Sequence, residues 1–114
     1  MARLLRALAL YAAATVAIAF LSRESLLLSA VLFALLVVAM FVDREPNDIW
    51  FPVGGFVFGP LTEMVSIDQG GWEYAVQDIA GIPLWLPFGW ATAALLLRRL
   101  AEALGALRGG KRER

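Results

Sequence analysis

The sequence predicts an all-α membrane protein, a bundle of four transmembrane helices followed by a short C-terminal interfacial helix. Hydrophobic residues make up 61% of the 114 residues, more than the roughly one half found in average globular proteins. They occur in four long blocks, which is typical of membrane-spanning helices. Charge is segregated too, because six of the ten basic residues lie in the last seventeen positions. The length allows one domain, residues 1–114.

The first span is predicted at residues 4–21, an apolar run with Arg3 and Arg6 at its start. At 1.5 Å per residue it would extend about 27 Å, close to the roughly 30 Å of a bilayer core. Residues 17–19, Ala-Ile-Ala, also resemble a signal-peptide cleavage site; of the two interpretations we favour a retained helix. A short turn leads to the second predicted span at residues 26–42.

The third span is predicted at residues 49–67 and the fourth at residues 79–97, although Pro83 and Pro87 interrupt the fourth. A polar connector joins them. The basic tail, residues 98–114, places three leucines on one helical face, which predicts the short interfacial helix.

The distribution of Lys and Arg predicts the orientation. With four spans and both termini cytoplasmic, only Arg23 of the ten basic residues lies on the outer side. Basic residues are enriched on the cytoplasmic side of membrane proteins. We therefore expect a multi-pass protein of the inner (plasma) membrane with both termini cytoplasmic and the acidic connector facing outward.

The composition restricts the chemistry. The chain has no Cys and no His, which excludes disulfides, thiolate nucleophiles and imidazole bases. Any proton chemistry must use carboxylates, tyrosine or water, and we predict no metal site and no cofactor. The basic tail follows an apolar helix and indicates a cytoplasmic anchor; no nucleic-acid-binding motif is present.

Residues 59–87 contain four acids and no Lys, Arg or His. Glu63 lies in the third span, where a carboxyl group among apolar side chains resists ionisation, so we expect it to act as a proton donor. Asp68 and Asp78 are predicted to complete an acid–base set with it. The alternative for Asp68, Asp78 and Glu73 is a solvated outer loop.

Small and aromatic residues accompany these acids. Gly55 and Gly59 form a stripe that Glu63 continues at the next four-residue step, so a flat lipid could approach the backbone there. Ordinary helix packing is the alternative for this pair. The predicted substrate-binding aromatic residues, which would stabilise a cation or otherwise serve as interfacial anchors, are Trp72, Tyr74, Trp85 and Trp90.

One run resembles a known family. Glu63, the stretch Gly-Gly-Trp-Glu-Tyr at residues 70–74, the stretch Gly-Ile-Pro-Leu-Trp-Leu-Pro at residues 81–87, and Trp90 are similar to the pattern of integral-membrane carotenoid-biosynthesis proteins of the hydratase type. The resemblance covers about a quarter of the chain. It implies a polyprenyl or carotenoid substrate and a hydratase or cyclase reaction through a protonated alkene. The chain is shorter than that family, and Trp72 stands where the pattern has Tyr.

Two other functions stay open, a proton-coupled small-molecule transporter and a non-catalytic membrane assembly subunit. Small four-span exporters use one intramembrane Glu, although usually in their first span. The predicted partners are a membrane lipid or polyprenyl substrate and further copies of the chain. We expect a homo-oligomer because a second small-residue face, Ala9, Ala13 and Ala17, accompanies the Gly55–Gly59 stripe.

Overall fold

The computed structural model describes residues 1–109 as four α-helices without a β-strand, which confirms the predicted all-α class. The helices are α1 (Ala2–Leu21), α2 (Ser25–Phe41), α3 (Trp50–Asp68) and α4 (Leu86–Gly109). A tight turn joins α1 to α2, residues 42–49 join α2 to α3, and a non-helical connector, residues 69–85, joins α3 to α4.

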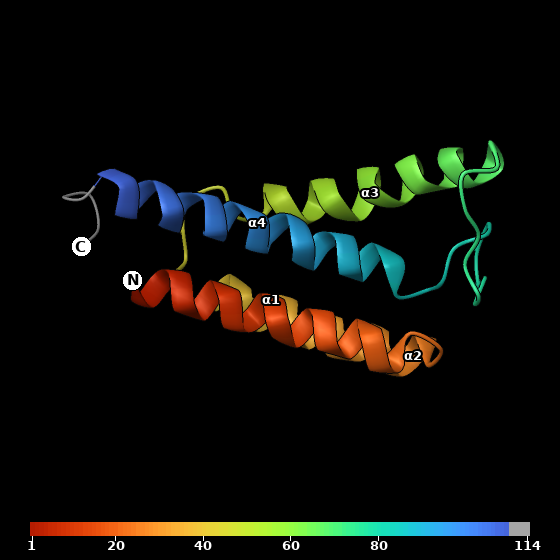
Figure 1. Cartoon of the computed structure of the whole chain (residues 1–114), viewed down its shortest axis with the longest axis horizontal. Helices are drawn as coiled ribbons and strands as arrows, with labels where there is room; N and C mark the ends of the chain where they lie inside the picture. Colours follow the sequence, from red (N-terminus) through yellow and green to blue (C-terminus); the bar gives the residue numbers. More distant parts are fainter. Residues whose placement is uncertain (110–114) are drawn as a thin grey trace.

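The central helix is α4, which packs against the three others (Figure 1). Its buried positions combine small and large side chains: Leu86, Ala91, Thr92, Leu95, Leu96, Arg99 and Ala103. Helices α1 and α2 also pack against each other, whereas α3 packs against α4 and no other described helix. Helices α2 and α3 therefore lie on different sides of α4 without direct packing.

The buried apolar side chains form two clusters along the bundle. The cluster nearer the connector contains Leu28 and Leu32 of α2 together with Trp85 and Leu86. The second joins Ala39 of α2 to Leu95 and Leu96 of α4. Large hydrophobic side chains outside these clusters are exposed on all four helices.

The first three helices begin and end close to the predicted spans, but the fourth does not. Residues 79–85 form a tight turn, with an isolated bridge between Ile79 and Ile82, and α4 begins only at Leu86. The two residues between the bridge partners, Ala80 and Gly81, have positive φ angles of 48° and 86°. Pro87 lies in the first turn of α4, where no amide hydrogen is needed for a helical hydrogen bond.

The prediction of a separate C-terminal interfacial helix is wrong. Helix α4 is continuous from Leu86 to Gly109, so residues 98–109 extend the central helix. Residues 110–114 of the predicted tail helix lie outside the described residues. The extension is stabilised where Arg98 and Arg99 donate hydrogen bonds to residues 42–48 and to the end of α2.

By length and composition one described helix, α1, is apolar enough to cross a bilayer unaided. Helix α2 is more apolar than α1 but has 17 residues.

Candidate functional site

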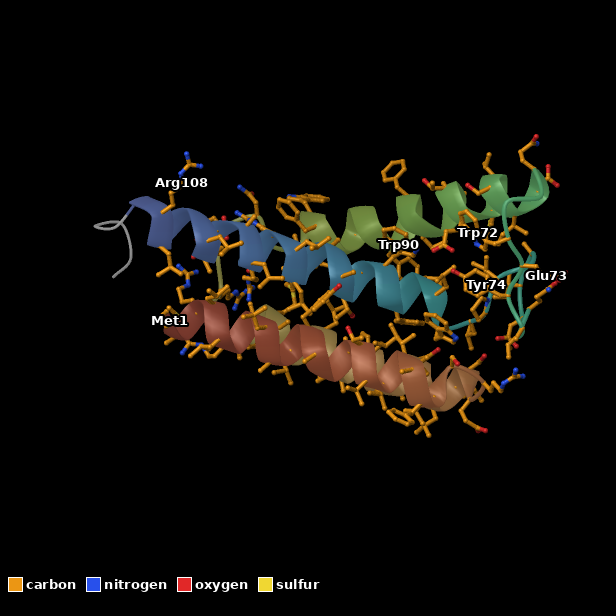
Figure 2. All side chains as sticks on the ribbon, viewed as in Figure 1. Met1, Trp72, Glu73, Tyr74, Trp90 and Arg108 are labelled. Atoms are coloured by element: carbon orange, nitrogen blue, oxygen red, sulfur yellow. The ribbon has the colours of Figure 1, made fainter. Side chains whose placement is uncertain are left out.

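Glu63 lies at the centre of a cluster of hydrogen-bonded aromatic side chains. It is on α3, and its residue exposure is only 8%. Its Oε1 accepts a hydrogen bond from the Tyr74 hydroxyl of the connector, and its Oε2 accepts one from the indole N–H of Trp90 on α4. Figure 2 labels these two donors, Tyr74 and Trp90. Each carboxyl oxygen thus has one neutral donor. We call Glu63, Tyr74 and Trp90 the Glu63 cluster.

The two glycines that precede Glu63 on its helix face make room for Trp90. A Cβ atom at Gly59 would lie 2.7 Å from the Cβ of Trp90 and closer still to its indole ring. A Cβ atom at Gly55 would lie 2.9 Å from the Cβ of Ala94 and would also overlap the backbone of Trp90. The stripe therefore packs against α4 of the same chain, which is the ordinary-packing alternative, and Trp90 covers the face that we expected a lipid to approach.

Tyr74 connects the cluster to the rest of the connector. Its pKa is raised, first because the hydroxyl is partly buried and second because it donates to Glu63, while a hydrogen bond with the Trp72 side chain acts in the opposite direction. Its ring meets the ring of Trp85 edge to face, with 6.3 Å between centroids. Trp85 in turn donates its indole N–H to the Ser22 carbonyl at 3.1 Å.

The other predicted acids do not join the Glu63 cluster. Asp68 is the exposed last residue of α3. Asp78 accepts hydrogen bonds from the Ser25 hydroxyl at 2.6 Å and from the Leu84 amide at 2.8 Å. These two bonds, the Ser25 hydroxyl first, lower the pKa of Asp78, so its carboxyl is ionised near pH 7 and cannot donate a proton there. Asp78 thus fastens the connector to the start of α2.

Of the predicted substrate-binding aromatic residues, Tyr74 and Trp90 belong to the Glu63 cluster, and Trp85 contacts it through the ring of Tyr74. Trp72 is half-exposed and reaches the cluster only through Tyr74. Within residues 1–109 no three Asp or Glu side chains come together in a way that could hold a metal ion.

A hollow of about 390 Å³ lies between the connector and the α1–α2 turn. We call it the connector-end hollow. The rings of Tyr74 and Trp85 border it, and Arg23 supplies its one charged side chain; its full lining is Ile18, Ala19, Ser22, Arg23, Tyr74, Ala75, Val76, Pro83 and Trp85. Glu63 is not a lining residue; its hydrogen bond with Tyr74 connects it to this hollow.

The opposite end of the bundle contains a buried ion pair that the sequence analysis missed. Asp48 and Arg99 are 3% and 5% exposed, and Arg99 donates to Asp48 and to the Ala39 carbonyl, the latter at 2.7 Å. Arg98 donates to Asp48 as well, at 3.2 Å. We had interpreted Arg98 and Arg99 only as anchors. The pair could have been suspected from the sequence, because Asp48 directly precedes the third apolar segment and Arg99 closely follows the fourth.

The loop between α2 and α3 is fastened to α1 by further ion pairs. Arg6 donates two hydrogen bonds to Asp43, and Arg3 pairs with Glu45. The Arg6 guanidinium holds the pKa of Asp43 below its usual value. Polar side chains are thus concentrated at the two ends of the bundle.

Comparison with family models, with curated proteins and with solved structures finds no match to this chain. The resemblance to carotenoid-biosynthesis proteins therefore stays a prediction.

Proposed function

We propose that this chain is a multi-pass membrane protein that binds an isoprenoid-like lipid in the connector-end hollow, beside the Glu63 cluster. Its membrane location is supported by the exposed surface. Soluble monomers rarely expose apolar patches larger than a few hundred Å². Here large apolar side chains are exposed on every helix. Examples are Val16 and Phe20 on α1, Phe33 and Val38 on α2, Phe58 and Val65 on α3, and Leu97 on α4.

The placement of charge supports the same location. Ion pairs gather near the N-terminus of α1 and the loop before α3, while the acids of the connector lie at the other end. Figure 1 shows the N-terminus and the end of α4 at the same end of the bundle. The basic excess at that end supports a cytoplasmic location for it, because Lys and Arg are enriched on the cytoplasmic side of membrane proteins.

The observation that carries the lipid proposal is the composition of the connector-end hollow. Ligand pockets are mostly apolar concavities of about 300–1,000 Å³ with a few polar groups that fix orientation. This hollow has a suitable volume, aromatic rings from Tyr74 and Trp85, and one cation in Arg23. A chain of isoprene units would lie against the rings, with its polar end toward Arg23.

Alkene protonation is a second candidate, favoured by the hydrogen bond between Glu63 and Tyr74. A proton on Glu63 would reach a ligand through the Tyr74 hydroxyl, whose ring borders the hollow. Both oxygens of Glu63 are already engaged, and neither Asp68 nor Asp78 is hydrogen-bonded to it. The arrangement therefore supports binding more directly than catalysis, and it offers no separate support for proton-coupled transport or for an assembly subunit.

The proposed homo-oligomer is supported by one small-residue face, that of α1, instead of the two that we expected. The Gly55–Gly59 stripe is covered by α4, so a second copy would have to use the α1 face, on which Ala9 and Ala13 are exposed.

The proposed function can be tested with all-trans-retinol, a polyene isoprenoid that quenches tryptophan fluorescence. The purified chain in lipid nanodiscs is titrated with retinol, and Trp85 is expected to be quenched saturably. Ala19 is exposed and lines the hollow, so Ala19→Phe should fill the hollow and weaken binding at least tenfold. Ala12 is exposed on the same helix and does not line the hollow, so Ala12→Phe should bind as the wild type does. Equal quenching of both variants would refute the binding site.

A further inference from the structure

A second apolar depression lies between α2 and α3, near the end of the bundle opposite the connector. It has a volume of about 230 Å³ and no polar lining surface. Met40 of α2 and Val53 and Val57 of α3 form its walls, and Ala91 of α4 forms its floor. It exists because α2 and α3 each pack against α4 and do not pack against each other. We call it the α2–α3 groove.

Aromatic rings close the groove toward the connector. Phe88 of α4 stands edge to face with Phe33 of α2, at 6.2 Å between centroids, and with Phe56 of α3, at 5.5 Å. The other end reaches residues 42–49, because the lining residues Met40 and Ile49 flank this loop on its two sides. An occupant of the groove therefore has its polar end at the loop.

The loop offers one cation for such a polar end. Its three acids are already neutralised: Asp43 by Arg6, Glu45 by Arg3, and Asp48 by Arg98 and Arg99. Arg44 is exposed and forms no ion pair among residues 1–109; its guanidinium lies 5.7 Å from the ring centre of Phe41. The loop thus presents an uncompensated positive charge directly after an apolar helix.

The size of the groove selects its occupant. The groove holds 230 Å³, which suits a single hydrocarbon chain. A neutral lipid would leave Arg44 without a counter-charge, whereas an anionic headgroup would supply one.

We propose that the α2–α3 groove binds one acyl chain of an anionic phospholipid and that Arg44 binds its phosphate-containing headgroup. This inference rests on the membrane location proposed above, but not on the connector-end hollow. The two sites lie at opposite ends of the bundle, so each can fail without the other.

The test is native mass spectrometry of the chain released from bilayers of equimolar phosphatidylglycerol and phosphatidylcholine. The wild type should retain one phosphatidylglycerol in preference to phosphatidylcholine. Arg44→Gln should reduce this preference about fivefold, the effect of one basic side chain near the membrane surface. Arg108→Gln removes the same charge further along α4, where the side chain is exposed (Figure 2), and should leave the preference unchanged.

Val57→Trp separates the groove from the headgroup site. Val57 is exposed in the groove wall, so a bulky side chain should abolish retention of both lipids without disturbing the buried core. Retinol quenching should be unaffected in Arg44→Gln. Equal retention of the two phospholipids, an unchanged preference in Arg44→Gln, or a dimer that Val57→Trp dissociates would each overturn the proposal.

Discussion

Replacing Gly59 by alanine tests how α3 is joined to α4. The new Cβ would lie 2.7 Å from the Cβ of Trp90, a distance that side-chain rotation cannot relieve because that atom is attached to the backbone. Helix α3 must therefore shift away from α4, and the indole N–H of Trp90 would lose its acceptor on Glu63.

The expected cost follows from three contributions. Overpacking a well-packed contact costs about 2 kcal/mol, and leaving the buried Glu63 carboxyl without one of its two donors costs about 2 kcal/mol more. Alanine returns about 1 kcal/mol through its higher helix propensity. Gly59→Ala should thus lower the free energy of unfolding by about 3 kcal/mol, a large share of the stability of a small domain.

Gly54 provides the matched control on the same helix. A Cβ atom there has no heavy atom within 4 Å, so Gly54→Ala should be neutral or should stabilise by up to about 1 kcal/mol. Unfolding in mixed micelles with increasing sodium dodecyl sulfate, followed by circular dichroism, measures both variants. If Gly59→Ala were as stable as Gly54→Ala, α3 would not pack on α4 through Trp90.

Three further predictions concern the connector. Tyr74→Phe should destabilise by about 2 kcal/mol, because its hydroxyl donates to Glu63, whereas Tyr11→Phe on an exposed face should change little in the same titration. Ala80→Gly should stabilise by about 1 kcal/mol, because Ala80 has a φ of 48°; an unchanged midpoint would mean that this turn is not strained. Asp78 has a lowered pKa in the folded chain, so its contribution is complete above the unfolded value near 4 and is lost as the pH falls through the folded value. Asp78→Asn should lose less stability than the wild type between about pH 5 and pH 2, and parallel curves would contradict this.

Much of the fold could be predicted from the sequence because the apolar blocks at residues 4–21, 26–42 and 49–67 are long and bounded by charged or polar residues. The start of the fourth helix was harder to predict from the sequence. Residues 79–85 are largely apolar, and the structure shows that the chain turns there, through the bridge between Ile79 and Ile82 and the positive φ angles of the two residues between them. The extension of α4 past Arg98 depends on tertiary partners in the loop at residues 42–49.

The candidate site, too, could be predicted only in part from the sequence. Glu63 could be singled out because it is an acid within an apolar helix, and its four-residue spacing from Gly59 correctly placed both on one face. Its donors could not be paired with it in advance, since the register of α4 against α3 brings Trp90 onto Gly59. Asp48 and Arg99 were missed for the same reason: their contact is set by packing between distant segments.

The proposed function requires that the chain span the membrane with its connector and the C-terminal end of α4 on opposite faces. The chain has no native cysteine, so single cysteines can be labelled from either side with a membrane-impermeant maleimide. Glu73 and Arg108 are exposed and lie near opposite ends of the bundle (Figure 2). In intact spheroplasts Glu73→Cys should be labelled at once and Arg108→Cys only after permeabilisation. Labelling of both positions from the outside, or recovery of the chain in the soluble fraction after a carbonate wash, would contradict the account.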